Sequence, residues 1–378
     1  MISTHAFSSI RSIDREAWNE CFPDQLEDWD FYWAVEQAGV EGFTWRYLAV
    51  FDGPTLLGVV PAFVTCYRLD TTIQGVGKRV TEHINRVWPG VFDLRMYAVG
   101  SPVAERCNAG TARHVSGPLR QEVFNRLLQR AQQDADDLGI GLLAVKDAPT
   151  DEPLWAETCS LAGLQNMPGL PSALLAVPYP SLDAYLGSLG KSTRKDLRRT
   201  LRGPAPRIEW RRQIDDVLPE IMQLYEATLA RSDLQFERLG PGYFTGLLDQ
   251  LGERAVCVLY WIDERLVAFN LMLLDEHRLI DKIFAHDPNR TREYNLYARS
   301  WLANVEYCID HRIPVYEAGQ AGYASKIRFG CRFAPNQLFF RHRNRLLNTL
   351  LRLIRQIIRP DRSDPALAAA LSPLSDPR

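Results

Sequence analysis

The sequence of 378 residues lacks several features that mark particular classes of protein. No stretch approaches the roughly 18 apolar residues of a membrane-spanning helix, and no apolar run follows a basic start as in a secretory leader. The seven histidines show no H-x-x-x-H spacing, and the seven cysteines form no C-x-x-C pair. We therefore expect a cytoplasmic protein with reduced thiols and no metal site.

A strong net charge is also missing, because 44 basic residues face 46 acidic ones and the formal net charge is −2. Without a global attraction for polyanions, DNA is not an expected partner, and any contact with nucleic acid needs a local basic patch. Apolar residues make up 46% and charged residues 24%, which leaves enough apolar material for a sizeable core. The length suggests two domains.

A faint internal repeat is the main organisational signal. Residues 46–64 and 255–273 each contain an apolar strand, an acidic turn and a second apolar strand. Each hairpin is followed by a strand, a long helical pattern and another strand, at 93–103, 119–138 and 141–146 in one copy and 278–288, 291–309 and 314–317 in the other. This order predicts an α+β protein of two similar domains, each a mixed, mostly antiparallel sheet flanked by helices.

The domain boundary is expected near the proline-rich stretch 168–182. We predict an N-terminal domain over 1–170 and a C-terminal domain over 181–343. The segment 361–378 has the composition of a loose tail.

Residues 344–360 predict an amphipathic helix with Leu347, Leu350, Leu351, Ile354 and Ile358 on one side. Its flank is basic and consists of Arg345, Arg352, Arg355 and Arg359. Packing of the apolar side against the second domain is the favoured interpretation, and peripheral contact with a membrane is the alternative.

A second helix, at 189–202, carries six cations spaced so that all fall on one face: Lys191, Arg194, Lys195, Arg198, Arg199 and Arg202. Such a face suits a phosphorylated ligand or a nucleic-acid backbone. The alternative is a solvated helix face whose cations pair with acids elsewhere in the fold.

The stretch GQAGYASKIRFG, residues 319–330, resembles a phosphate-binding loop at first sight. A P-loop requires a lysine directly after a glycine, followed by serine or threonine. Here Ser325 precedes Lys326, and Tyr323 and Ala324 stand where the glycine is needed. The spacing therefore excludes a P-loop, and the glycines are expected to serve a turn.

Over residues 181–335 the chain resembles the GNAT-superfamily acyltransferases of the Fem-like branch, in which two GNAT folds sit in tandem. The helix at 189–202, the hairpin at 255–273 and the segment after the last strand carry the resemblance. In the family this strand ends in an acidic residue and a glycine, followed by Y-x-x-K, an aromatic residue and glycine. The matching residues here are Glu317, Gly319, Tyr323, Lys326, Phe329 and Gly330.

The resemblance implies acyl transfer, with Lys326 near the donor carbonyl or phosphate and Tyr323 donating a proton to the leaving group. Glu317 would be a base or the ion-pair partner of Lys326, and Arg328 would hold an acidic group. His286, after a strand that contains Asp281, would be a general base near neutral pH. The competing interpretations are packing for Tyr323, a surface ion pair for Glu317 and a turn residue for His286.

One departure from the family concerns the donor. GNAT enzymes usually cradle the pyrophosphate of acetyl-CoA with a glycine-rich turn, but the equivalent turn, 286–295, has no glycine. An anion there would meet the N-terminus of the following helix and the side chains Asn289, Arg290 and Arg292. The donor is expected to be either an acyl-CoA or an aminoacyl-tRNA.

The expected function is an N-acyltransferase that moves an acyl group from CoA to an amine of a small bacterial metabolite or cell-envelope precursor. A Fem-like transferase that uses charged tRNA is one alternative, supported by the basic helix, with Lys191, Arg194, Lys195 and Arg198 as binding residues. The other is a non-catalytic GNAT-like protein that binds a glycan or a partner enzyme.

Overall fold

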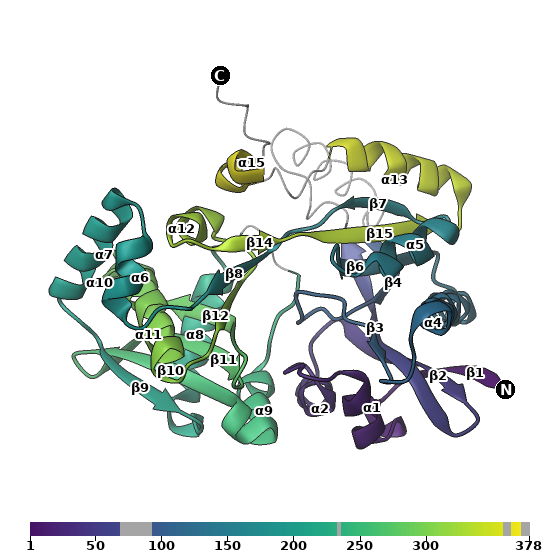
Figure 1. Ribbon diagram of the computed structural model, residues 1–378, viewed down its shortest axis with the longest axis horizontal. Helices are drawn as coiled ribbons and strands as arrows, with labels where there is room; N and C mark the ends of the chain where they lie inside the picture. Colours follow the sequence, from purple (N-terminus) through teal and green to yellow (C-terminus); the bar gives the residue numbers. More distant parts are fainter. Residues whose placement is uncertain (69–92, 233–235, 358–363, 372–378) are drawn as a thin grey trace. The chain divides into compact units, whose positions relative to one another are not determined.

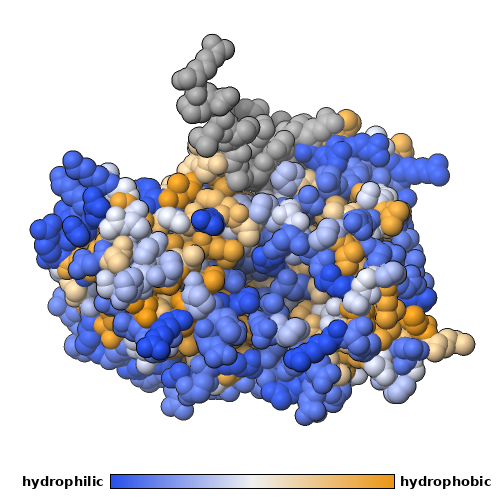
Figure 2. Space-filling model, in the orientation of Figure 1, coloured by the Kyte–Doolittle hydropathy of each residue, from blue (hydrophilic) through white to orange (hydrophobic). Residues whose placement is uncertain are grey.

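The computed structural model describes residues 1–68, 93–232, 236–357 and 364–371. It divides into two compact units (Figure 1). Unit 1 consists of Met1–Pro171, Leu234–Arg238 and Pro335–Ser363, and unit 2 of Ser172–Asp233, Leu239–Ala334 and Asp364–Arg378. Each unit contains one mixed sheet with helices packed on it, so the expected α+β class is confirmed. Hydrophilic side chains dominate the face seen in Figure 2.

Unit 1 is built on a sheet with the strand order β1-β2-β3-β4-β6-β15-β7, and β5 pairs with β3. All neighbours are antiparallel except β4 and β6. The strands are β1 Ile2–Phe7, β2 Phe43–Asp52, β3 Thr55–Arg68, β4 Asp93–Val99, β5 Gly110–Thr111, β6 Leu142–Pro149, β7 Gln165–Pro168 and β15 Asn336–His342. The helices are α1 Arg15–Cys21, α2 Trp29–Ala38, α4 Gly117–Asp137, α5 Pro153–Leu161 and α13 Arg345–Ile357.

Unit 2 has the strand order β14-β8-β13-β12-β11-β10-β9, in which only β12 and β13 are parallel. The strands are β8 Ser172–Ala176, β9 Arg207–Arg211, β10 Ala255–Ile262, β11 Arg265–Leu274, β12 Arg278–His286, β13 Val315–Gly319 and β14 Arg332–Ala334. The helices are α6 Leu182–Ser188, α7 Lys191–Arg202, α8 Leu218–Leu229, α9 Pro241–Leu251, α10 Pro288–Tyr294, α11 Leu296–Asp310, α12 Tyr323–Arg328 and α15 Pro365–Leu371.

The two units repeat the same plan. In unit 1 the hairpin β2–β3 pairs with β4, and α4 leads to β6 parallel to β4. In unit 2 the hairpin β10–β11 pairs with β12, and α11 leads to β13 parallel to β12. The repeat expected from the sequence is therefore present in the fold.

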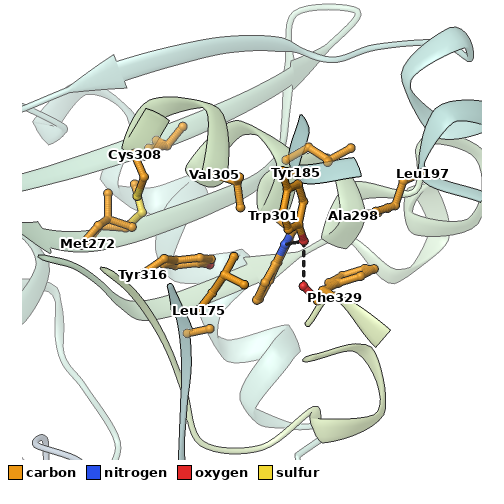
Figure 3. Close-up of a cluster of buried hydrophobic side chains, with 14 of the residues drawn as sticks. Leu175, Tyr185, Leu197, Met272, Ala298, Trp301, Val305, Cys308, Tyr316 and Phe329 are labelled. Carbon is orange, nitrogen blue, oxygen red and sulfur yellow. Dashed lines mark hydrogen bonds between the residues drawn. The ribbon is translucent and has the colours of Figure 1, made fainter. Parts of the chain in front are cut away.

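The core of unit 2 lies between its sheet and the helices α6, α7 and α11 (Figure 3). Trp301 of α11 is 2% exposed, and its indole N–H donates to the hydroxyl of Tyr185 at 2.8 Å. That hydroxyl donates in turn to the carbonyl oxygen of Phe329 at 2.9 Å. Burial of the two large rings supplies apolar stabilisation, and their polar atoms stay paired inside the core.

Strand β15 lies within the expected 181–343 domain in sequence, but in the structure it belongs to the sheet of unit 1. It pairs with β6 and β7 in the sheet of unit 1, and in Figure 1 it runs beside β7 although the two lie far apart in the sequence. Strand β8, which follows β7, instead joins the sheet of unit 2. No strand was expected at 336–342, and local pattern does not specify which distant strands a strand pairs with.

The C-terminal segments differ from expectation in the same way. The helix expected at 344–360 is α13, which packs on β15 and belongs to unit 1, whereas the expected use of its apolar side was packing against the second domain. Its Leu350 is 49% exposed, although it was expected on the packed side. The expected tail 361–378 contains α15, which contacts α12 and whose Leu367 is fully buried, while 361–363 and 372–378 lie outside the described residues.

Candidate functional site

The stretch 319–330 forms the end of β13, a tight turn and the short helix α12. Gly319, Gly322 and Gly330 have φ angles of 81°, 62° and 89°. These left-handed conformations cost a glycine little and strain most other residues. The glycines thus serve the backbone, as the sequence indicates.

Lys326 is buried, with 4% of its surface exposed. Its Nζ donates to the carbonyl oxygens of Gly319 at 2.8 Å and Gln320 at 3.1 Å. An ammonium group has three donors, so two of them hold the turn that ends β13. The structure therefore gives Lys326 a part in shaping the backbone, apart from the role near the donor carbonyl that the resemblance implies.

Two other candidate residues near Lys326, Tyr323 and Glu317, also make contacts within unit 2. Tyr323 is 1% exposed, and its ring packs edge-on against Phe333 with centroids 5.5 Å apart. Glu317 accepts from Arg278 at 3.3 Å across the β12–β13 pair. Tyr323 thus contributes to packing, and Glu317 is held in a partly buried ion pair.

Arg328 and the basic face of α7 lie in one part of unit 2. Arg328 pairs with Asp196 at 2.8 Å, and Arg194 donates to the carbonyl oxygen of Gly187 at 3.1 Å. Arg198 and Arg199 make longer contacts, to Asp183 at 3.7 Å and Asp196 at 3.6 Å. The side chains of Lys191, Lys195, Arg198, Arg199 and Arg202 are exposed, so most of the basic face points to solvent.

The turn expected to receive the donor pyrophosphate forms α10. Its N-cap, Asp287, accepts from the backbone N–H of Asn289 at 2.9 Å and pairs with Arg265 at 3.3 Å. A carboxylate therefore stands where an anion was expected. Asn289 is exposed, and the side chains of Arg290 and Arg292 lie outside the described residues.

His286 ends β12 directly before this turn. Burial lowers the pKa of its imidazole below the usual 6.5, and the charge of Arg231 lowers it further, against raising contributions from Asp287. The ring is 5.5 Å from that of Phe284. At neutral pH the imidazole is therefore uncharged and able to accept a proton.

The parallel strands β12 and β13 pair over only a short length. The pairing joins residues 278–280 to 315–317, and β12 continues to His286 beyond it. A bulge in the pairing of β11 with β12, between Leu271 and Met272, lies opposite the same point. Bulges redirect side chains and are frequent beside functional sites, so this divergence is the candidate site of unit 2.

Asp281 lies at the point of divergence and accepts hydrogen bonds from two neighbouring strands. Asn270 Nδ2 donates to its two carboxylate oxygens at 3.0 and 3.1 Å. The hydroxyl of Tyr316 donates to Oδ2 at 2.9 Å. These donors hold the Asp281 carboxylate in place at this opening.

A second layer of polar groups holds these donors in place. Asn304 donates to the hydroxyl of Tyr316 at 3.0 Å, and Tyr260 donates to Asn270 Oδ1 at 3.2 Å. Ser300 also donates to Asn270 Oδ1. Buried networks of this kind fix side-chain geometry, because a buried polar group without its hydrogen bond would lower the stability of the fold.

The tyrosines beside Asp281 stay protonated at neutral pH. Burial raises the pKa of Tyr316 well above 10, and the charge of Asp281 raises it further. Burial and the same charge also raise the pKa of Tyr297 and Tyr260. Tyr316 therefore remains a hydrogen-bond donor to Asp281, and Tyr260 remains a donor to Asn270.

Sequence reasoning marked Asp281 but missed its partners. A signal was present, since Asn270 interrupts the apolar strand RLVAFNLMLL and is fully buried. A lone amide in such a strand requires a partner. The partner's identity depends on strand register, which a single sequence does not give.

The corresponding opening in unit 1 is filled by its own chain. Strands β4 and β6 pair over 96–99 and 142–145, after which residues 100–109 cover β6. Lys146 Nζ donates to the carbonyl oxygen of Ala104 at 3.1 Å, and Cys107 N donates to that of Asp147 at 2.9 Å. The indole of Trp155 donates to the carbonyl oxygen of Cys107 at 2.9 Å. The backbone occupies this place, which leaves unit 2 as the carrier of the candidate site.

Over the described ranges, no group of three or more His, Cys, Asp or Glu residues is placed to hold a metal ion. Within the same ranges, no helix has the length and apolar character needed to cross a membrane.

Residues 190–326 match the family of the acetyltransferase (GNAT) domain. No curated protein matches the chain in sequence.

Solved structures share the fold over nearly the whole chain. FemX is 13% identical with a TM-score of 0.58, and the alignment covers 92% of this chain and 99% of FemX. The C-terminal domain of a putative lysylphosphatidylglycerol synthetase from Agrobacterium fabrum is 14% identical with a TM-score of 0.54, covering 92% and 97%. A tandem GNAT protein from the clavulanic acid biosynthesis pathway is 11% identical with a TM-score of 0.53, covering 90% and 98%.

Proposed function

We propose that unit 2 is an N-acyltransferase, because residues 190–326 match the acetyltransferase (GNAT) domain and the fold is similar to those of FemX and a tandem GNAT protein. The donor in this proposal is an acyl-CoA, and the acceptor is an amine of a small metabolite or cell-envelope precursor. The reaction takes place where β12 leaves β13.

The observation that carries the proposal is the Asp281 carboxylate at this divergence, hydrogen-bonded by Asn270 and Tyr316. Strands that separate leave backbone groups and side chains available to a ligand. A carboxylate beside them attracts an ammonium ion and orients it. The filled counterpart in unit 1 supports assigning the chemistry to unit 2 alone.

The proposed reaction needs a proton acceptor as well as an anchor. Asp281 binds the acceptor as its ammonium form, and the proton is lost to solvent, because His286 lies five residues further along β12, about 16 Å away and beyond hydrogen-bond reach of that site. The amine nitrogen then attacks the thioester carbonyl carbon, so that a C–N bond forms and the C–S bond breaks. The thiolate takes a proton from water and leaves as the thiol, and the attacking nitrogen loses its second proton to solvent, which leaves a neutral amide.

The test is to incubate the protein with acetyl-CoA or longer acyl-CoAs and a panel of amines, and to measure free CoA thiol. We expect release with at least one pair, and a large loss of kcat/KM in Asp281→Asn, about 100-fold if the carboxylate anchors the amine. Asp310→Asn is the matched control, since Asp310 is an exposed carboxylate at the end of α11.

Two results would contradict the proposal at different levels. Absence of CoA release, together with no thermal shift with any acyl-CoA, would reject a CoA donor. Release that is equal in wild type and Asp281→Asn would keep the activity but reject the assigned site.

Aminoacyl-tRNA is the second candidate donor, and a specific observation favours it. The exposed cations of α7 form one basic face, and α10 replaces the glycine-rich turn expected for a pyrophosphate. A nucleic-acid backbone would be attracted by this face with an affinity that falls steeply as salt rises.

Binding of charged and uncharged tRNA at several salt concentrations tests this candidate. We expect the double variant Lys191→Glu/Lys195→Glu to weaken binding by about tenfold or more and to lower the salt slope. Arg113→Glu in unit 1 is the control, because Arg113 is exposed on a different unit. Binding that does not depend on salt would reject the candidate.

A further inference from the structure

Helix α13 carries an apolar stripe on its outward face. Leu346, Leu350 and Leu353 are 82%, 49% and 56% exposed. Their spacing of four and three residues places them on one side of the helix. Exposed leucines are common singly, but an ordered stripe of three on one helix indicates a contact surface.

The opposite side of α13 is anchored to unit 1. Leu351 is buried, and Gln165 Nε2 donates to Asn348 Oδ1 at 2.9 Å. Asn348 Oδ1 also accepts from the backbone N–H of His342 at 3.0 Å, and Asn344 caps the helix by accepting from the N–H of Leu346 at 2.9 Å. These bonds set the rotation of the helix, so its leucine stripe is held outward.

All charged residues in the segment that contains α13 are basic. Residues 341–359 include six arginines and no aspartate or glutamate, in a chain whose net charge is −2. Arg343, Arg345 and Arg352 are exposed. Figure 2 shows strongly hydrophilic side chains next to hydrophobic ones at the upper right, where Figure 1 places α13.

We propose that α13 docks unit 1 on the surface of an anionic lipid membrane. The helix lies in the plane of the interface, with Leu346, Leu350 and Leu353 among the upper acyl chains and the arginines on lipid phosphates. An apolar stripe beside a cationic flank is the pattern that binds such interfaces. At 13 residues, or about 20 Å, α13 is too short to span a bilayer and long enough to lie on one.

The charge distribution favours this partner over two others. A second copy of the chain would bring two all-basic segments together, and like charges in contact oppose association. A nucleic acid would satisfy the arginines but would leave the leucine stripe in water. An anionic membrane can accommodate both the arginines and the leucine stripe. Its negative surface potential makes binding more favourable for each basic residue near the surface.

Co-sedimentation of the full chain with lipid vesicles tests the proposal. The vesicles are phosphatidylcholine alone, or equal parts of phosphatidylcholine and phosphatidylglycerol. We expect binding to the anionic vesicles to be stronger by about tenfold or more, and to weaken as salt is added.

Two variants separate the apolar and the charged contributions. Leu346→Ser/Leu353→Ser is expected to reduce binding to anionic vesicles by about tenfold or more, because two apolar side chains no longer insert. Arg345→Ala/Arg352→Ala is expected to abolish the preference for anionic lipid. All four side chains are exposed, so equal melting temperatures will show that unit 1 remains folded.

The control is Leu161→Ser, which removes a leucine that is 79% exposed at the end of α5, a helix other than α13. It should leave vesicle binding unchanged. Equal binding to neutral and anionic vesicles, or full binding by the Leu346/Leu353 variant, would overturn the proposal. Dimerisation that the leucine variant abolishes, without vesicle binding, would replace the membrane with a second copy.

Discussion

Lys326 and Asp281 are charged residues of unit 2 that use their charges differently. The ammonium of Lys326 donates to carbonyl oxygens of the turn after β13, whereas Asp281 receives donors from two strands where the sheet opens. The motif that resembles the Fem-like branch draws attention to the lysine. The geometry instead gives Asp281 the position suited to an incoming amine.

Replacing Lys326 by methionine should therefore lower stability. The carbonyl oxygens of Gly319 and Gln320 would lose a buried charged donor, at a cost of about 1–3 kcal/mol in the free energy of unfolding. Urea unfolding measures the change, and Lys191→Met on the exposed face of α7 is the control. A Lys326→Met protein of unchanged stability but greatly reduced kcat would contradict the backbone role.

His286 should make the protein less stable in acid. Its pKa is below the unfolded value of 6.5, so the unfolded state binds the proton more tightly and stability falls as pH drops below about 6.5. Urea midpoints at about pH 7.5 and about pH 5.5 measure this loss. His286→Gln should reduce it, and part will remain because the pKa of His342 is also lowered. An identical loss in the variant would show that His286 does not contribute.

At the scale of helices and strands, the sequence predicted the elements whose formation depends on the local pattern of residues. Apolar runs on either side of an acidic turn revealed the two hairpins, and helical periodicity revealed α4, α7 and α11. It could not assign β15 to the sheet of unit 1, because pairing of strands distant in the chain depends on the assembled sheet. A turn was expected at 286–295, where α10 forms, although Asp287 followed by Pro288 is a signal for the start of a helix.

The same limit applies to the candidate site. Asp281 was recognisable as a charge within an apolar strand, but Asn270 and Tyr316 join it only through the register of β11, β12 and β13. The bulge beside residue 281 then changes which side chains share a face. Functional partners on separate strands are thus determined by topology rather than by local sequence.

Two glycines in different elements should respond oppositely to alanine. At Gly110 in β5, an added Cβ would lie 2.8 Å from the carbonyl oxygen of Cys21, so Gly110→Ala should destabilise by about 1–3 kcal/mol. At Gly187 in α6 nothing lies within 4 Å, and alanine should stabilise by about 0.5–1 kcal/mol. Thermal unfolding compares them. Equal effects would argue against the close packing of β5 on α1.

For the molecule as a whole, β14 and β15 are adjacent in sequence but belong to different units. Phe333 of β14 packs in unit 2, and Phe339 of β15 is 3% exposed in unit 1. The division between the units passes between two strands that are separated by a single residue.

Substitutions on the two sides of this division should act on different units. Phe339→Ala should destabilise unit 1 by about 3–5 kcal/mol through the cavity that it leaves. Hydrogen exchange should then accelerate in β6 and β7 and stay unchanged in β10 and β11. Phe333→Ala, which removes a half-buried ring in unit 2, should give the reverse pattern with a smaller effect. Acceleration in both sheets with either variant would mean that the units unfold as one.

The position of β15 also determines the order in which the sheets can be completed during synthesis. All strands of the unit 2 sheet lie between residues 172 and 334, whereas the unit 1 sheet lacks an inner strand until residue 342 has been made. The ribosome therefore starts unit 1 first, but unit 2 is the first to have a complete sheet. Until β15 arrives, the edge of β6 has no neighbour on that side, and such an unpaired edge is where a nascent chain is most exposed to wrong pairing.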